Sequence, residues 1–331
     1  MIRRHAPPEC VEAHQQITSL IDNVYESGNE AALFQLKAAF NVSQSSTYPD
    51  LAFLLTSPLS AWNQVWHRKP FPFTGSYCDP ITSQASHYPT TETLRTTAHS
   101  LLSYANRTAT ANATALYYPL LNFFSHIRES STYCAGRSVH DWLSLGRPSP
   151  YGWLTRTESG GLAMGYTLGS EGHPHLPPMA SCMLSPAYFL DRCHRAYNIT
   201  YEPQLVWLNK YGGPSLSYLR LAVSTGQLDY HRGLGPLAEF LENGDPNPRL
   251  VRNINDNGDY NNGSSSSSSS ITTPQIIIQG GFHEWDFPGL FQNETAVEMP
   301  LAVQRAKTIE VEAVMAWLTE WNVTHTDIHA M

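Results

Sequence analysis

The sequence predicts an α/β protein with a large, mainly helical region at residues 1–200 and a region of strands, loops and helices at residues 201–331. Two stretches in the second region carry this prediction. In QIIIQGG, residues 275–281, a short β-branched apolar run ends in two glycines, which is typical of a strand buried on both faces and followed by a sharp turn. In YLRLAVSTG, residues 218–226, a glycine again follows apolar strand residues, namely Leu219, Leu221 and Val223.

Residues 9–128 are predicted to be mostly helical. Near their start, apolar residues recur at the spacing of one helix face, at Val11, Ile17, Leu20, Ile21 and Val24. Gly28 separates this helix from an alanine-rich helix at residues 31–40. Further helices are predicted at residues 50–66 and 93–127, the second of them interrupted near two glycosylation sequons.

Two segments have the composition of loops. Residues 133–178 are rich in Gly, Ser and Pro, which predicts irregular structure or long loops. Within them His173 and His175 are spaced like a pair of metal ligands, but a solvated loop is the favoured interpretation, and no metal or cofactor is predicted. Residues 253–270 end in an unbroken serine run and are predicted to be a disordered surface insertion.

The last predicted helix runs from Pro300 to Trp321. Proline is tolerated near the start of a helix, which favours this boundary. Apolar residues recur at helical spacing, at Ile309, Ala313, Val314, Trp317 and Trp321. We therefore expect this helix to pack on the sheet.

Composition and charge exclude two classes of partner. With 41% hydrophobic and 11% aromatic residues, the 331-residue chain can form a sizeable core. A net charge of −8 argues against nucleic-acid binding, which needs a basic surface. No apolar run reaches the length of a transmembrane helix, so a membrane partner is not expected either. The oligomeric state is not determined by the sequence.

Glycosylation sequons and cysteines indicate a secreted chain. Sequons of the form N-x-S/T occur at Asn41, Asn106, Asn112, Asn198, Asn262, Asn293 and Asn322. The five cysteines include no C-x-x-C pair for zinc and fit one or two disulfides in an oxidising compartment, with at least one thiol left over. Against secretion, the N-terminus lacks the apolar core of a signal peptide, and the sequons could arise by chance.

A charged residue that suits proton transfer follows each of the two predicted strands: Asp229 after the first and His283 after the second. This order, an acid and then a histidine after parallel strands, is how the last two members of a catalytic triad are placed in an α/β-hydrolase. Asp229 would hold the imidazole of His283 in the required tautomer, so we expect the two side chains within hydrogen-bonding distance. The alternative is a loop histidine that only hydrogen-bonds a neighbour.

Several motifs together resemble the serine carboxypeptidase family that contains lysosomal prolyl carboxypeptidase, dipeptidyl peptidase II and fungal acid prolyl peptidases. The resemblance runs nearly end to end. It rests on the helix with Cys10, YCD at 77–79, WLTRTESG at 153–160, NKYGG at 209–213, GQLDYH at 226–231 and GGFHEWD at 280–286. The last two are the most specific.

The resemblance implies a fold and a function. The fold is the C-terminal part of an α/β-hydrolase domain at residues 201–331, with residues 1–200 forming the mainly helical cap or lid. The function is that of a serine-type exopeptidase, a carboxypeptidase or dipeptidyl peptidase, that cleaves peptides beside proline at acid pH in a secreted, vacuolar or lysosomal setting. Asp229 and His283 match triad members. Glu158 is expected to face the substrate cleft and bind a peptide's amino group, unless it is a solvated loop charge.

The chain departs from the family pattern at several positions. Tyr230 and His231 stand where the family usually has Pro-Trp after the aspartate, and Glu284 stands where it has a second histidine. Arg156 replaces a cysteine, which would leave that cysteine's partner unpaired.

The nucleophile is the largest departure. No G-x-S-x-G pentapeptide occurs in the chain. In TGSYCD, residues 74–79, Ser76 is a poor candidate because it follows Pro70 and Pro72 rather than a strand and lacks a glycine two residues later. We therefore expect an N-terminally truncated form that lacks the nucleophilic serine, is inactive by itself and is poorly stable alone, since its strands lack neighbours.

Two alternatives stay open. One is a non-catalytic secreted glycoprotein, or peptide-binding pseudoenzyme, that retains the cap as an interaction surface. The other is a stand-alone hydrolase that uses Ser76 as a displaced nucleophile.

Overall fold

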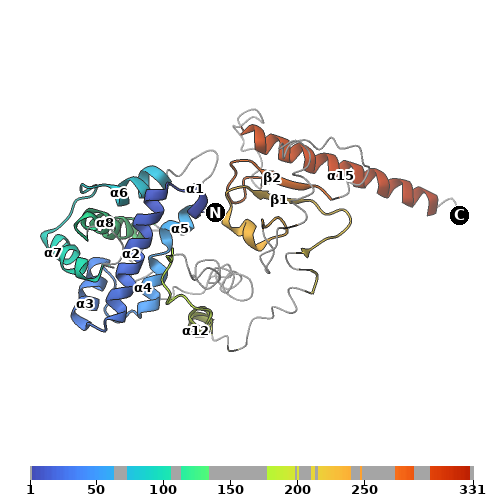
Figure 1. Ribbon diagram of the computed structural model, residues 1–331. Coiled ribbons are helices and arrows are strands. Elements are labelled where there is room, and N and C mark those ends of the chain that lie inside the picture. The colour runs from blue at the N-terminus through green and yellow to red at the C-terminus, as the bar shows by residue number, and fades with distance from the viewer. Residues whose placement is uncertain are drawn as a thin grey trace. The chain divides into compact units, whose positions relative to one another are not determined.

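The computed structural model describes residues 2–62, 73–105, 113–133, 177–197, 200, 210–212, 215–239, 247, 273–286 and 299–328. The chain divides into two compact units (Figure 1). The helical unit comprises residues 2–62 and 72–204, and the sheet unit comprises Met1 with residues 63–71 and 205–331.

The described elements of the helical unit are all helices. Its α-helices are α1 Ile2–His5, α2 Pro8–Glu26, α3 Glu30–Ala39, α4 Tyr48–Leu54, α5 Ser57–Trp62, α6 Asp79–Thr82, α7 Glu92–Leu101, α8 Tyr117–Tyr133 and α12 Pro186–Tyr197. The π-helix η1 spans Phe73–Cys78, and the 3₁₀-helices η2 and η3 span Leu102–Tyr104 and Ala113–Leu116. The mostly helical character predicted for residues 9–128 is confirmed for the described part of that range.

Side-chain caps explain where several of these helices begin. The side chain of Asn29 accepts hydrogen bonds from the first amides of α3, while Thr47 and Thr91 cap α4 and α7 in the same way. The helix predicted at residues 50–66 is instead two helices, because α4 ends at Leu54 and Pro58 lies at the start of α5. The break between α4 and α5 therefore follows from a local sequence signal, the proline at the start of α5.

The helical unit has an apolar core, and a disulfide links two of its segments. Residues from distant parts of the chain are fully buried there, including Ile17, Leu36, Leu51, Phe123 and Phe124. The Cys10–Cys78 disulfide joins α2 to the end of η1 across a sequence separation of 68. Closing a loop of this length stabilises the folded chain by about 4 kcal/mol in the chain-entropy account.

The other cysteines are only partly described. Cys182 is a free, exposed thiol. Cys134 and the side chain of Cys193 lie outside the described residues. The predictions of at least one disulfide and at least one unpaired thiol are therefore both confirmed.

A buried histidine links three segments of the helical unit. His14, on α2, is 2% exposed, and its Nε2 lies 2.7 Å from the carbonyl oxygen of Met179 while its Nδ1 contacts the hydroxyl of Tyr77. A carbonyl can only accept, so Nε2–H donates to Met179 and Nδ1 accepts from Tyr77 in the neutral ring. Burial lowers the pKa of His14 to about 4, which keeps the ring neutral above that pH.

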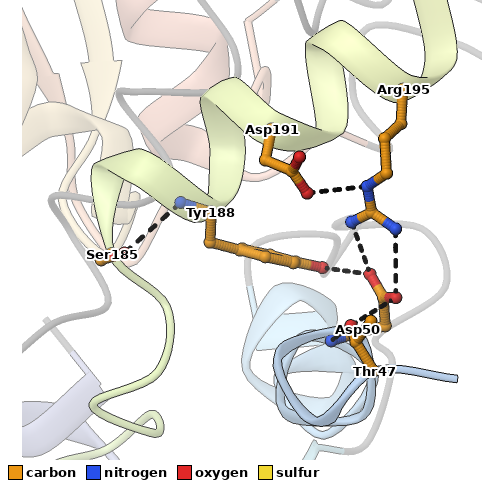
Figure 2. A network of polar contacts seen from close by, with 6 residues as sticks. All are labelled: Thr47, Asp50, Ser185, Tyr188, Asp191 and Arg195. Atoms are coloured by element: carbon orange, nitrogen blue, oxygen red, sulfur yellow. Dashed lines mark hydrogen bonds and ion pairs between the residues drawn. The ribbon is translucent and has the colours of Figure 1, made fainter.

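A polar network joins α12 to α4 (Figure 2). The hydroxyl of Tyr188 donates to Asp50 at 3.1 Å, and Nη2 of Arg195 lies 3.3 Å from the same carboxylate oxygen. Asp191, one turn before Arg195, binds its Nε at 2.7 Å and fixes the guanidinium. Beside this network Ala52, Ala180, Leu184, Tyr188 and Phe189 form an apolar cluster. Residues about 140 positions apart in the chain are thereby held together.

The sheet unit contains a two-stranded parallel sheet in its described part. Strand β1, Val223–Gly226, pairs with β2, Gln275–Ile278, and Gly226 lies opposite Ile278. The 3₁₀-helix η5, Tyr230–Leu234, follows β1, and helix α15 spans Leu301–Ile328. The predicted second strand is confirmed, but the prediction that it is buried on both faces is wrong. Ile276 and Ile278 are buried because their face packs against α15, whereas Ile277 is half-buried and Gln275 is exposed. The first strand was predicted to include Leu219 and Leu221, which is wrong, because β1 begins only at Val223. Leu219 is 83% exposed, and the chain turns at Arg220, whose φ is 58°.

Helix α15 packs on the sheet with one end only. Its residues Val303 and Ala306 are buried in a cluster with Ile276, Ile278 and Met299. Of the predicted apolar face, Ala313 is buried and Trp317 is half-buried, but Ile309, Val314 and Trp321 are exposed, so the prediction that this whole face packs on the sheet is wrong. The reason is length: four strand residues span about 13 Å, whereas the 28 residues of α15 span about 42 Å.

Some predictions concern residues outside the described ranges. These are the irregular structure of residues 134–176, the metal-like spacing of His173 and His175, the serine-rich insertion at 253–270, and the location of Glu158. Within the described ranges, no helix is both long enough and apolar enough to cross a membrane.

Candidate active site

The site lies where the two parallel strands end. β1 ends at Gly226, three residues before Asp229, and β2 ends at Ile278, five residues before His283. Parallel strands end at the same edge of a sheet. Backbone hydrogen bonds continue past the strands, from the amide of Gln227 to the carbonyl of Ile278 at 2.9 Å. The two loops therefore leave the sheet together.

Glycines allow the close approach of these loops. A Cβ atom on Gly226 would overlap the carbonyl oxygens of Gly281 and Phe282, so only glycine fits there. Gly280 has a φ of 68°, a conformation that side chains with a Cβ rarely adopt. The amide of Leu228 then donates to the carbonyl of Gly281 at 2.8 Å, which fixes the separation of the loops that carry Asp229 and His283.

Asp229 and His283 form a direct hydrogen bond. Oδ2 of Asp229 lies 2.9 Å from Nδ1 of His283, and Asp229 is 5% exposed. The other carboxylate oxygen accepts the amide of His231 at 2.8 Å, so the acid is held at both oxygens. An ionised carboxylate only accepts, so the proton is on Nδ1 of His283 and Nε2 is the reactive nitrogen. The predictions of hydrogen-bonding distance and of adjacent parallel strands are both confirmed.

The electrostatic environment favours the charged form of His283. The hydrogen bond that His283 donates to Asp229 raises the pKa of His283, burial opposes this, and the charges of Asp229, Glu284 and Asp286 raise it further. The net result of these effects is that the pKa of His283 is raised. The arrangement therefore stabilises the imidazolium that forms when a histidine accepts a proton during catalysis.

Two contacts to His283 were not predicted from the sequence. The ring of His231 lies 4.7 Å from the ring of His283, tilted by 39°. Oε1 of Glu284 lies 3.5 Å from Nε2 of His283, on the side opposite Asp229. Both positions stand out in the sequence as departures from the family pattern, but nothing in that pattern shows that they contact the same ring.

Ser76 has no features of a nucleophile. It lies inside the π-helix η1 of the helical unit, rather than at a turn between a strand and a helix. Its carbonyl accepts a hydrogen bond from the hydroxyl of Tyr88 at 3.4 Å. Across the described residues, no group of three or more His, Cys, Asp or Glu side chains is placed to hold a metal ion.

Comparison with known proteins gives one informative similarity. No family model matches the chain. The chain is 26% identical over 341 residues to a protein of Arthroderma benhamiae described as a "Probable extracellular serine carboxypeptidase". The alignment covers 98% of this chain and 43% of that relative, so the chain spans less than half of the relative's length. Over nearly all of its own length, the chain is therefore similar to a protein described as a serine carboxypeptidase.

Proposed function

We propose that Asp229 and His283 are the acid and the base of a Ser-His-Asp triad in a serine-type exopeptidase that cleaves peptides beside proline. The observation that carries the proposal is the 2.9 Å hydrogen bond between these side chains at the ends of two adjacent parallel strands. The similarity to a serine carboxypeptidase supports the reaction class. The preference for proline, and the choice between carboxypeptidase and dipeptidyl peptidase, rest on the resemblance alone.

The geometry suits general acid–base catalysis. Asp229 keeps the proton of His283 on Nδ1, so that Nε2 can take a proton from a serine hydroxyl that attacks the peptide carbonyl. The imidazolium then gives this proton to the leaving amine, which breaks the peptide bond. Asp229 stays ionised throughout and stabilises the imidazolium.

The nucleophile in this proposal comes from sequence outside these 331 residues. The chain contains no G-x-S-x-G pentapeptide, and the relative has additional length that the alignment does not cover. By itself, a chain with only the acid and the base is expected to be inactive, because triad members act as a unit.

Substrate binding and working pH belong to the same proposal. Glu158 binds the amino group of the peptide from the cap, as the family resemblance implies. The resemblance also implies an acid pH optimum. The raised pKa of His283 acts against it, because a protonated imidazole cannot accept a proton from serine. A pH profile of the whole protein will show which effect dominates.

We also propose that the protein is a glycoprotein that works outside the cytosol, secreted or in a vacuole or lysosome. The relative is described as extracellular, and the Cys10–Cys78 disulfide suits an oxidising compartment. The Asn41 sequon is accessible, since its side chain is exposed. A mass shift on treatment with an N-glycosidase, from native material, is the expected result.

A second candidate function is a non-catalytic protein that binds peptides with its helical cap. The lack of a serine elbow in the chain favours it. It differs from the first candidate in a measurable way, because binding requires neither Asp229 nor His283.

Labelling with a fluorophosphonate, which reacts with activated serines, separates these functions. The native protein should be labelled on a serine that is not among these residues, and should hydrolyse peptides with a proline next to the cleaved bond. His283→Gln should abolish both labelling and hydrolysis, while the exposed control His99→Gln on α7 should change neither. Peptide binding without labelling would support the second candidate, and a label on Ser76 would contradict both.

A further inference from the structure

Two residues besides Asp229 contact His283. Glu284 and His231 stand where the family pattern has other residues, and they belong to different loops. In the structure one contacts Nε2 of His283 and the other contacts its ring. The base therefore has neighbours on three sides: Asp229 at Nδ1, Glu284 at Nε2, and His231 against the ring.

The backbone directs Glu284 toward Nε2. Glu284 has a φ of 57°, in the left-handed region, which costs a residue other than glycine roughly 1 kcal/mol. The turn begins at the two glycines after β2 and carries the carboxylate back over the ring that precedes it. The resulting distance between Oε1 and Nε2 is 3.5 Å, within the range of an ion pair. The side chain of Glu284 is 51% exposed, so water screens this pair.

His231 limits movement of the His283 ring. Its own position is fixed because its amide donates to Asp229, the residue that also binds His283. Burial lowers the pKa of His231 and so favours its neutral form, whereas the pKa of His283 is raised. An offset, tilted contact between the two rings is a favourable arrangement.

Further charged groups among the described residues lie near Asp286. The charge of Asp286 acts on His283 from the same loop. From helix α15, Lys307 donates to the carbonyl of Asp286 at 2.7 Å, and Glu310 interacts with the charges of Asp286 and Lys307. Glu284 is thus the carboxylate placed at Nε2, and Asp229 the one placed at Nδ1.

We propose that Glu284 is a positioning residue that closes a second ion pair on His283, so that the protonated ring is held between Asp229 and Glu284. Nε2 is the nitrogen that a serine hydroxyl must reach, so the nucleophile has to displace Glu284 before the reaction. This consequence for catalysis rests on the proposed function, whereas the ion pair does not. The pair favours the imidazolium form of His283 for as long as Glu284 stays at Nε2.

The first test measures the ion pair without any reaction. NMR of the full chain with ¹³C- and ¹⁵N-labelled histidine gives the midpoint pH at which His283 titrates, assigned with a His283→Gln sample. Glu284→Gln keeps the side-chain shape and the backbone preference and removes only the charge. We expect its midpoint to fall by about 0.2 to 0.7 pH unit, the range of a half-exposed ion pair. Raising the salt concentration should lower the midpoint of the unmodified chain toward that of the variant.

Glu312→Gln is the matched control, because Glu312 is an exposed carboxylate on α15. It should leave the midpoint unchanged. Equal midpoints for Glu284→Gln and the unmodified chain would overturn the proposal, as would a fall of the same size in Glu312→Gln.

The second test uses hydrolysis by the native protein that carries the nucleophile. Glu284→Gln should shift the acid limb of kcat/KM to lower pH by the same amount as the NMR midpoint, with the limb in Glu312→Gln unmoved. A merely structural role would lower activity at every pH instead, and would overturn the proposal. If the NMR midpoint falls but the native protein hydrolyses no peptide, the ion pair is supported and the proposed function fails, so the two can be told apart.

Discussion

The contacts that stabilise the helical unit internally differ from those that stabilise the sheet unit internally. In the helical unit, a disulfide, a buried histidine and the Asp50 network connect segments that are far apart in the sequence around a closed apolar core. In the described part of the sheet unit, two four-residue strands meet one end of a long helix. Of the large apolar side chains that are exposed among the described residues, all but Phe34 lie in the sheet unit.

This difference shows that contacts at the strand ends can fix the site locally. Backbone hydrogen bonds beyond the strand ends and glycines at the loop contacts set the distance between Asp229 and His283. We therefore expect changes in the helical unit to alter stability, and changes at the strand ends to alter chemistry. The following predictions test this separation.

The largest expected effect is on activity, from Asp229→Asn. The amide cannot hold His283 in the required tautomer or stabilise its charge, so kcat of the native protein should fall about 10³- to 10⁴-fold. The unfolding of the helical unit, followed by urea titration, should not change. A loss of activity that follows a loss of helical-unit stability would break the proposed separation of the two units.

Cys10→Ser should have the largest effect on stability. Loss of the Cys10–Cys78 disulfide removes about 4 kcal/mol from the free energy of unfolding of the helical unit. The control is Cys182→Ser, which changes an exposed free thiol and should have little effect. The urea midpoints of both variants measure the change in the stability of the helical unit. The pH midpoint at which His283 titrates by NMR should stay constant in each variant.

His14 should make the helical unit sensitive to acid. Its pKa is about 4 in the folded protein and about 6.5 when unfolded, so the unfolded chain binds more protons between these values. The stability due to the neutral ring is complete above pH 6.5 and falls by about 3 kcal/mol as the pH drops to 4.

His14→Gln tests this pH dependence. Glutamine can still accept from Tyr77 and donate to Met179, but it does not titrate. Between pH 6.5 and 4, the urea midpoint of the variant should fall clearly less than that of the unmodified chain. An identical slope in both proteins would show that His14 is not the responsible group.

The smallest predicted effect is that of Tyr188→Phe. This change removes the hydrogen bond from the Tyr188 hydroxyl to Asp50 but leaves the ion pair with Arg195, and should cost about 1 kcal/mol of helical-unit stability. Tyr118→Phe on α8 is the control.

The effect of Tyr188→Phe should also depend on pH. Burial raises the pKa of Asp50, but hydrogen bonds from Thr47 and Arg195 outweigh the effect of burial and lower this pKa. The cost of Tyr188→Phe, measured by thermal unfolding, should therefore be smaller below the pKa of Asp50.

The sequence by itself determined the features that depend on neighbouring residues. Apolar spacing identifies α2, Gly28 marks the break before α3, and the order of strand, glycine and charged residue identifies Asp229 and His283 as partners. These signals are local because a helix or strand end uses residues within one or two turns of each other. Glu158 and the serine-rich insertion remain predictions.

Only the tertiary structure decided which distant residues meet. The pairing of Cys10 with Cys78, the contact of Arg195 with Asp50, and the exposed far end of α15 are not encoded in any local pattern. The same holds for Glu284 and His231, whose contacts with His283 depend on a left-handed turn after β2 and on the pairing of two strands about 50 residues apart. The physical reason is that burial and ion pairing depend on the distance between side chains, and this distance is set by how the elements pack.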